Sequence, residues 1–356
     1  MIPDQPDTRR AIPRLCHDPV SGRPVFVAPQ RRGKPDDRVL ATGLGAADDP
    51  LAWCPFCAGN EARTPPDLAR APADPTLPWR ARIVPNTFPI TVADPRRTLH
   101  DEPREAGGIH DVVIESPRHD RSVLDVSTEG WHDVWKLCRQ RLGAAADLGS
   151  ITWATVFKNS GPKAGASLEH VHSQIVGLDV VPPAIEAEAA TIRRDEATFP
   201  RLLEAARRGG RCVAERGDLV AIVPPAPRQP FETWIVTGEP EAYFHATSAA
   251  RVAAVADLTR DVVARLERLA PGCHFNWWLH QPPFPRGRHD ERLVAGWHWH
   301  LEIVPRLSEF AGFEIGTGCH ITTRSAEDSA ALLRAAGGQP AASASQSMPG
   351  GIDAAP

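Results

Sequence analysis

The sequence predicts an α+β fold in which antiparallel sheets are flanked by helices and two halves repeat the same order of elements. Short apolar, β-branched stretches bounded by proline, glycine and asparagine recur in both halves, and each half has one long helical pattern rather than regular βαβ alternation. A His-x-His phrase also closes each half, at residues 170–175 and 298–303. An internal duplication within one hydrogen-bonded assembly explains the matching order.

In the first half, apolar stretches predict strands at residues 24–29, 81–85 and 110–116. A helix is expected at residues 127–148, because apolar side chains recur there at helical spacing. These side chains are Trp131, Val134, Cys138 and Leu142. A strand at residues 152–159 then leads to the first His-x-His phrase.

A helix predicted at residues 184–208 separates the halves. The second half then repeats the pattern, with strands expected at residues 211–215, 219–224, 232–237 and 274–281. Its long helix is predicted at residues 248–269, with Ser248 as the N-cap.

These patterns divide the chain into four parts. Residues 1–13 form a flexible N-terminus, residues 14–183 the first half and residues 184–334 the second half. The tail at residues 335–356 is rich in alanine, serine, glycine and proline and is predicted to be disordered.

Composition excludes several classes of function. The net charge of −4 gives no reason to expect nucleic acid or an anionic membrane as a partner. No apolar run reaches the ~18–20 residues that span a bilayer, and the N-terminus lacks the apolar core of a signal peptide. Seven cysteines without an export signal predict a reducing, cytoplasmic location.

Cys54 and Cys57 form a CxxC motif that suits either a metal site or a redox pair. Zinc requires two further nitrogen or sulfur ligands, and the sequence has no second CxxC. Histidines brought in by the fold, with His119 and His170 as candidates, would complete the set. Two unpaired core cysteines remain the alternative.

His172 is the candidate nucleophile, because a neutral imidazole attacks phosphorus readily near pH 7. Gln174 points to the same strand face and can donate to a phosphoryl oxygen. The preceding stretch, residues 161–167, can present backbone N–H groups and a hydroxyl to an anion, with Lys158 and Lys163 nearby.

A short basic run follows the first predicted strand. Arg31, Arg32 and Lys34 suit either a solvated turn or a clamp for a diphosphate, since guanidinium forks match phosphate geometry.

The second phrase places His298, His300 and Glu302 on a strand, with His280 on the strand before it. Three imidazoles and a carboxylate suit a second zinc or an iron ion. A polar network without metal is the alternative.

Several motifs together resemble galactose-1-phosphate uridylyltransferases of the histidine-triad superfamily, over about residues 14–334. They are CPFC at 54–57, VPNTFP at 84–89, ESPRH at 115–119, KNSG at 158–161, SLEHVHSQ at 167–174 and HWHLEI at 298–303. The resemblance implies two histidine-triad-like halves and a homodimer with sites near the subunit interface.

The resemblance also implies roles for individual residues. Cys54, Cys57, His119 and His170 resemble the ligands of a structural zinc, His172 the residue that becomes nucleotidylated, and Gln174 the residue that contacts the transferred phosphoryl group. Substrate contacts are implied for Arg31, Lys34, Asn86, Asn159, Gly165, Ser167, Phe313 and Glu314. A second metal site is matched by Glu188, His280, His298 and His300. Glu186 is close enough in sequence to Glu188 that either could be the matching carboxylate.

Three positions depart from the family pattern. Val171 stands where proline is frequent, and its side chain points away from the histidines. Thr87 stands where an acidic residue can help to recognise uracil, and His320 occupies the approximate place of a sugar-contacting glutamine. The last two positions bear on the base and the sugar rather than on the transfer chemistry.

The sequence thus predicts a nucleotidyltransferase that moves UMP from UDP-glucose to galactose 1-phosphate through a uridylyl-histidine on His172. One alternative is an enzyme resembling the relatives that phosphorolyse ADP-glucose, with phosphate or another anion as acceptor. A metal-stabilised nucleotide sensor is the alternative from another class, and the presence of both His172 and Gln174 disfavours it.

Overall fold

The structure of the protein, a computed structural model, describes residues 12–18, 23–29, 31, 54–95, 104–285 and 291–337. The predicted flexible N-terminus and disordered tail therefore lie largely outside the described residues. Residues 335–337 are an exception, because they complete the helix α9 (Ala326–Gly337).

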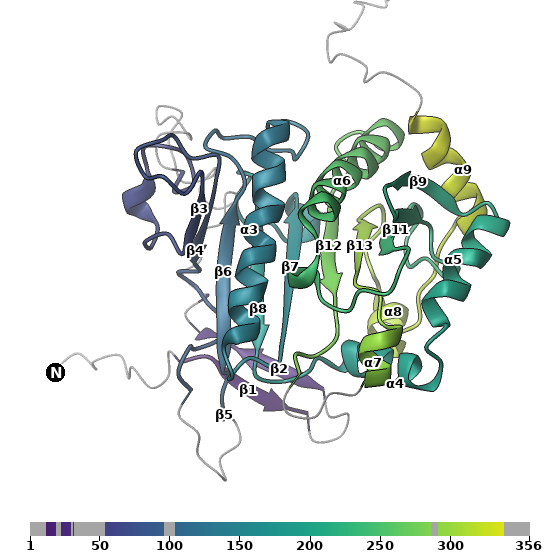
Figure 1. Ribbon diagram of the computed structural model, residues 1–356, viewed down its shortest axis with the longest axis horizontal. Coiled ribbons are helices and arrows are strands. Elements are labelled where there is room, and N and C mark those ends of the chain that lie inside the picture. Colours follow the sequence, from purple (N-terminus) through teal and green to yellow (C-terminus); the bar gives the residue numbers. More distant parts are fainter. Residues whose placement is uncertain are drawn as a thin grey trace, which may run out of the picture.

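One antiparallel sheet of ten strands runs through the molecule and contains strands from both halves (Figure 1). In spatial order the strands are β3 (Ala69–Ala71), β4 (Ala81–Pro85), β6 (Gly108–Ile114), β8 (His172–Leu178), β7 (Trp153–Ser160), β12 (Phe275–His280), β13 (His300–Pro305), β11 (Thr233–Thr237), β10 (Leu219–Ile222) and β9 (Cys212–Arg216). The halves join where β7 pairs with β12, from Phe157↔Trp278 to Ser160↔Phe275. The predicted α+β class with an antiparallel sheet is confirmed.

Two long helices, α3 (Thr128–Asp147) and α6 (Ala249–Leu269), lie side by side on one face of the sheet (Figure 1). Each begins at a serine N-cap, because Ser127 accepts from Gly130 N–H and Ser248 accepts from Arg251 N–H. The prediction for Ser248 is confirmed. The helices bury an apolar layer against the sheet, in which Trp131 of α3 packs on Trp277 of β12.

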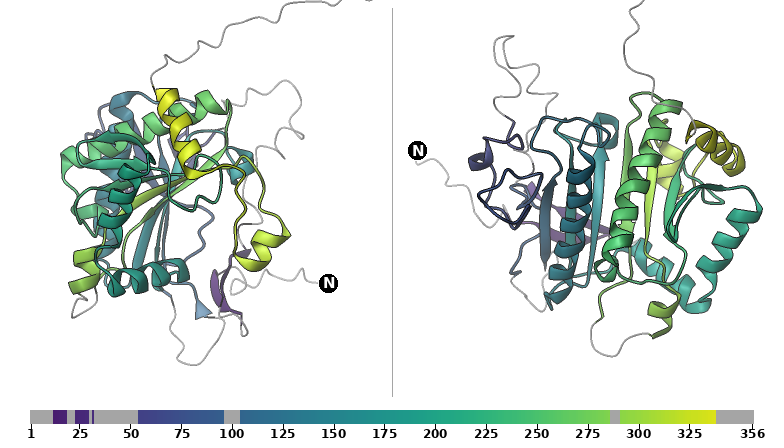
Figure 2. Two further views of the ribbon diagram at one scale, coloured as in Figure 1. Left: turned by 90° about the vertical axis from the view of Figure 1, so that its right-hand side faces the viewer. Right: turned by 45° about the horizontal axis from the view of Figure 1, so that its top comes forward.

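The opposite face of the second half is covered by α4 (Pro183–Arg194), α5 (Thr198–Arg208) and α7 (Glu291–Gly296), which Figure 2 separates from α6. The prediction of one helix at residues 184–208 is wrong. The chain breaks at Asp195, whose carboxylate accepts from Ala197 N–H at 3.1 Å. Pro200 explains the break, since its ring has no N–H and would collide with the carbonyl four residues earlier in a continuous helix.

A second, small sheet has the order β2 (Pro24–Val27), β1 (Arg14–His17) and β5 (Arg104–Glu105). The sequence predicted β2 but neither β1 nor β5, the other two strands of this sheet. The remaining elements are 3₁₀ turns at Glu61–Arg63, Pro162–Ala164 and Phe244–Ala246 and the short helix α8 (Gly312–Thr317). Among the described helices, none is long and apolar enough to cross a membrane.

The sequence predicted that each His-x-His phrase lies on a strand, but only the second histidine of each phrase does. β8 begins at His172 and β13 at His300, so His170 and His298 precede their strands. Val171 N–H is bonded to Asp120 O at 2.8 Å rather than to a strand of the large sheet. The first histidine of the first phrase is thereby turned toward the loop that contains Asp120.

Candidate active site

Cys54, Cys57, His119 and His170 come together in space, with all four donor atoms within 4.8 Å of one another. The Sγ–Nδ1 separations are 3.5 Å for Cys54–His170, 3.5 Å for Cys57–His119 and 3.6 Å for Cys57–His170. Zinc–sulfur and zinc–nitrogen bonds of normal length at a tetrahedral angle require about 3.6 Å. The donor set and its spacing therefore fit zinc, and a redox pair or two unpaired core cysteines do not explain this arrangement.

Local contacts hold these ligands in place. Asn60 Nδ2 donates to Cys54 O at 2.8 Å, and His170 Nε2 lies 2.9 Å from Ser116 O. The second contact assigns the ring proton to Nε2 and presents Nδ1 to the cluster. Burial lowers the pKa of His170 to about 4, so its neutral, metal-binding form predominates at pH 7.

His172 lies directly beside the cluster at the start of β8. Its Nδ1 is 2.7 Å from His170 O, which fixes the tautomer with the proton on Nδ1 and the lone pair on Nε2. The ring packs against Phe56, at 5.4 Å between centroids. His170 thus contributes a ring to the Cys/His cluster and a backbone carbonyl that orients His172, the candidate nucleophile.

A cavity of about 420 Å³ opens in front of His172 and Gln174. It lies on the face of the sheet opposite α3 and α6, because Ile175 of β8 packs into the core under those helices while Gln174 points the other way. Its wall also includes Phe56, Asn86, Thr87, Phe88 and Ser167. Its aromatic and amide lining suits a nucleotide.

Only some of the other substrate-binding residues predicted in the first half line this cavity. Asn86 and Ser167 line it, and Arg31 donates to Phe88 O at 2.8 Å. Asn159 lies on β7 two residues after Phe157, which pairs with Gln174. Its side-chain oxygen accepts from Asn276 Nδ2 at 2.8 Å. Gly165 has φ +86°, a conformation that favours glycine at the end of its 3₁₀ turn. Lys34 and Arg32 lie outside the described residues.

Phe313 and Glu314 do not line this cavity within the chain. Both lie on α8, where Phe313 is 53% exposed and Glu314 accepts from Ala311 N–H at 3.0 Å. The structure also contradicts the expectation that Lys158 faces an anion. Lys158 is 2% exposed, and its ammonium pairs with Glu115 at 2.5 Å on the helix-covered face.

The sequence analysis did not single out His110, which is 5% exposed and contacts two residues of the cavity wall. Its Nε2 lies 2.9 Å from Gln174 Oε1 and 3.0 Å from Asn86 Nδ2. A lone histidine in the strand Gly108–Ile114 carries no spacing signal of its own. Only the pairing of β6 with β8 shows that it neighbours Gln174.

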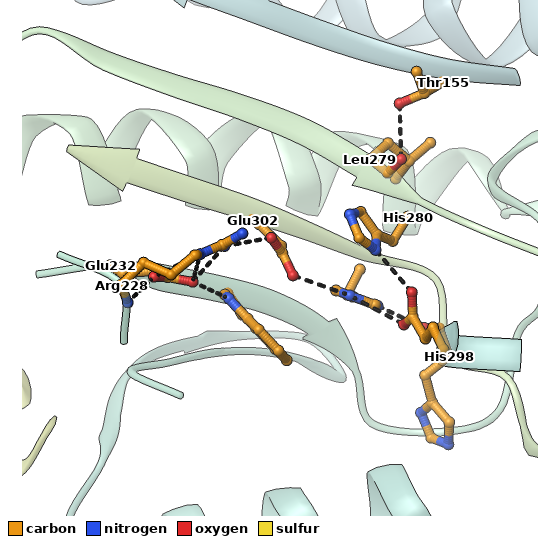
Figure 3. Close-up of polar contacts among 10 residues, drawn as sticks. Thr155, Arg228, Glu232, Leu279, His280, His298 and Glu302 are labelled. Atoms are coloured by element: carbon orange, nitrogen blue, oxygen red, sulfur yellow. Dashed lines mark hydrogen bonds and ion pairs between the residues drawn. The ribbon is translucent and has the colours of Figure 1, made fainter. Parts of the chain in front are cut away.

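Glu188, His280 and His300 form a second cluster of donor atoms within 4.8 Å, and His298 is not part of it. His280 Nδ1 lies 2.8 Å and His300 Nε2 3.4 Å from the Glu188 carboxylate. Figure 3 shows His298 apart from the dashed network. Its Nδ1 donates to Thr237 O at 2.7 Å, and its ring packs on Phe199 at 5.1 Å between centroids.

The cluster continues into a chain of charges that reaches Arg228, which lies between Glu232 and Glu302 (Figure 3). Burial would lower the pKa of His300, but the carboxylates of Glu188 and Glu302 raise it above its ordinary value. Burial would likewise raise the pKa of Glu302, but its His300 contact and the nearby cations hold it well below its usual range. Paired charges of this kind are what a polar network without metal requires. The three donor groups Glu188, His280 and His300 also suit a metal ion.

Metal analysis of the purified protein decides between these two interpretations. We expect more than one metal ion per chain, with Glu188→Gln losing the excess and retaining the zinc at Cys54, since amides are weaker metal ligands than carboxylates. Glu186→Gln is the matched control, because Glu186 lies exposed on the same helix. A wild-type content of one zinc would identify the second cluster as a polar network.

Comparison with known proteins finds relatives that match nearly the full length of this chain. The chain is 33% identical to ADP-glucose phosphorylase of Arabidopsis thaliana over 332 residues, which covers 90% of this chain and 92% of the relative. The chain belongs to the galactose-1-phosphate uridylyltransferase-like family of the histidine-triad superfamily. A family model described as a domain of unknown function, DUF4921, also matches residues 123–333.

Two further comparisons extend this family assignment. A galactose-1-phosphate uridylyltransferase of Thermotoga maritima is 25% identical over 244 residues, covering 65% of this chain and 74% of the relative. The crystal structure of the Arabidopsis ADP-glucose phosphorylase with bound ADP-glucose has a TM-score of 0.71 at 30% identity, covering 90% of this chain and 98% of that one. A uridylyltransferase structure at 24% identity has a TM-score of 0.74, covering 91% and 98%, and supports the fold alone. The protein is therefore an enzyme of this nucleotidyltransferase and phosphorylase family.

Proposed function

We propose that this protein is an ADP-glucose phosphorylase-like enzyme that transfers AMP from ADP-glucose to phosphate through a covalent adenylyl-histidine. The similarity to the Arabidopsis enzyme over nearly the full length of both chains carries the proposal. It replaces the uridylyltransferase as the leading hypothesis, because the relative named for that activity is more distant and matches less of the chain. The two hypotheses share their chemistry and differ in base and acceptor.

In the first step, Nε2 of His172 attacks the α-phosphorus of ADP-glucose. A P–N bond forms, and the bond between the α-phosphorus and the bridging oxygen breaks, so glucose 1-phosphate leaves with the electron pair. The hydrogen bond from Nδ1 to His170 O holds the ring for attack and stabilises the positive charge that develops on it.

In the second step, an oxygen of inorganic phosphate attacks the same phosphorus. The P–N bond breaks, ADP forms and His172 regains its lone pair on Nε2. Gln174 lies two residues further along the cavity wall and would donate to the transferred phosphoryl group in both steps. A zinc ion with four protein ligands has no open position for a substrate, so at the Cys54 cluster it would hold the loop and His170 in place.

The cavity wall supports adenine as the base. Thr87 lines the cavity at the position where an acidic residue can help to recognise uracil, and threonine offers no carboxylate to the uracil N–H. Phe56 and Phe88 supply aromatic surface on which a purine can stack.

The wider organisation of the molecule is proposed on the same basis. The mirrored order of five strands from each half supports an internal duplication of a histidine-triad-like unit, with halves at residues 14–183 and 184–334. A homodimer would bring the exposed Phe313 and its neighbour Glu314 of one chain toward a partner's site, which a single chain does not do. The second cluster is proposed as a site for zinc or iron.

Intact mass spectrometry after brief mixing with ADP-glucose, and separately with UDP-glucose, tests the proposal. We expect a mass increase of AMP with ADP-glucose that is discharged by phosphate with release of ADP. An adduct of UMP that galactose 1-phosphate discharges would instead identify a uridylyltransferase. The absence of an adduct with either donor would refute the covalent mechanism.

A further inference from the structure

The contacts around His110 fix the protonation of a buried ring that adjoins the candidate active site. His110 lies on β6 and Gln174 on β8, where Gln174 pairs with Val112 and His110 with Val176. The two side chains are therefore diagonal neighbours on the face of the sheet that carries the cavity. His110 itself is absent from the cavity wall.

The backbone decides which nitrogen of His110 carries the proton. Ile90 N–H donates to Nδ1 at 3.1 Å, and a backbone amide can only donate. Nδ1 must therefore hold a lone pair, and the neutral ring carries its proton on Nε2. Unlike a side-chain amide, a backbone N–H cannot be flipped, so this assignment is independent of how Asn and Gln are oriented.

The tautomer of His110 in turn decides the orientation of Gln174. The Nε2–H of His110 lies 2.9 Å from Gln174 Oε1 and donates to it. With its oxygen held in this way, the Gln174 amide directs its NH₂ group to the other side, and the side chain lines the cavity beside His172. A reversed amide would present an oxygen, which repels a phosphoryl group.

Asn86 contacts the same edge of the ring. Its Oδ1 accepts from Phe88 N–H at 2.8 Å, so its amide nitrogen is the atom that lies 3.0 Å from His110 Nε2. Two N–H groups then meet at this edge, where Gln174 Oε1 accepts the hydrogen bond from the ring N–H. The Asn86 contact accordingly does not compete for the His110 proton.

We propose that His110 is a positioning residue that sets the amide of Gln174 with its N–H donors toward the phosphoryl group. The inference rests on the proposed nucleotidyl transfer and adds to it a residue that does not itself touch substrate. His110 also holds the loop at residues 86–90, through Ile90 N–H and through its own carbonyl, which accepts from Asn86 N–H at 2.9 Å. A test must separate the two effects.

A double-mutant cycle makes this separation. His110→Phe keeps a ring of similar size and removes the donor, and Gln174→Ala removes the amide that it orients. We expect His110→Phe to slow formation of the histidine adduct about 10- to 100-fold in the wild-type background. In the Gln174→Ala background it should have no further effect, because nothing is left to orient. If the rate losses of the two single variants instead multiply in the double variant, His110 acts only through the loop and the proposal is overturned.

ADP affinity, measured by calorimetry for the same four proteins, provides a readout that needs no turnover. We expect His110→Phe to weaken ADP binding in the wild-type background and to have no further effect on it in the Gln174→Ala background. If the wild-type protein forms no adduct but the ADP cycle shows coupling, the proposed reaction fails and the role of His110 stands. If adducts form and neither cycle shows coupling, the reaction stands and the role of His110 fails.

Nitrogen-15 NMR of histidine side chains tests the wild-type protein directly, including the case in which His110→Phe does not fold. We expect the His110 resonances of a neutral ring protonated on Nε2. A ring protonated on Nδ1 would be incompatible with the proposal.

Discussion

Replacing His172 with alanine is expected to abolish nucleotidyl transfer and leave the fold intact. The variant removes the only atom proposed to bond to phosphorus, so we expect kcat to fall by at least about 10⁴-fold and the mass adduct to disappear. Folding should survive, because the His172 side chain packs at the edge of a cavity and the adjacent candidate zinc ligands are unchanged. Intact mass, turnover and zinc content measured on one preparation check all three expectations.

His17→Ala is the control, since His17 is an exposed histidine at the end of β1 and does not line the cavity in front of His172. It should retain the adduct and the turnover of the wild type. If His172→Ala kept a full adduct together with normal zinc, another residue would be the nucleophile.

The sequence predicted the elements whose signals are local. Both long helices begin at serine N-caps and bury apolar stripes at helical spacing, because capping and periodicity act within a few turns of the chain. The break between α4 and α5 was missed although Pro200 marks it. The apolar pattern continues across the break, since both helices bury one stripe against the same face of the sheet.

The parts that failed or were missed depend on pairing between distant strands. The face that Lys158 occupies follows from the register of β7 against β8, in which Phe157 rather than Lys158 shares the face of Gln174. His110 becomes relevant only when β6 pairs with β8 and the loop at residues 86–90 folds onto it. Neither the register of paired strands nor a loop contact can be inferred from the spacing of residues in the sequence.

The four residues Cys54, Cys57, His119 and His170 show what family resemblance adds. Spacing alone left zinc, a redox pair and two core cysteines open. The residues offered His119 and His170 as candidate partners, the resemblance favoured a zinc site made of all four, and the fold brings the four donors together. Phe313 and Glu314 come from the resemblance alone, and they lie on the exposed helix α8 rather than in the cavity of their own chain. Motif resemblance indicates residue roles, but it does not tell whether a residue reaches the cavity of its own chain.

Replacing Cys54 with serine is expected to lower zinc content and stability together. Serine offers a neutral hydroxyl in place of a thiolate, so three protein ligands remain and zinc binds far more weakly. The zinc would connect the turn at Cys54 and Cys57 with His119 and His170, segments that lie far apart in sequence. Its loss should therefore lower the free energy of unfolding by several kcal/mol.

Activity should fall in Cys54→Ser as well, because His170 O orients His172 and the position of His170 depends on the cluster. Metal analysis, thermal unfolding and turnover on the same sample distinguish this effect from loss of the nucleophile, which should leave zinc unchanged. Cys319→Ser is the control, since Cys319 is exposed and remote from the cluster in sequence. Normal zinc and normal stability in Cys54→Ser would remove Cys54 from the ligand set and, with it, the structural account of how His172 is held.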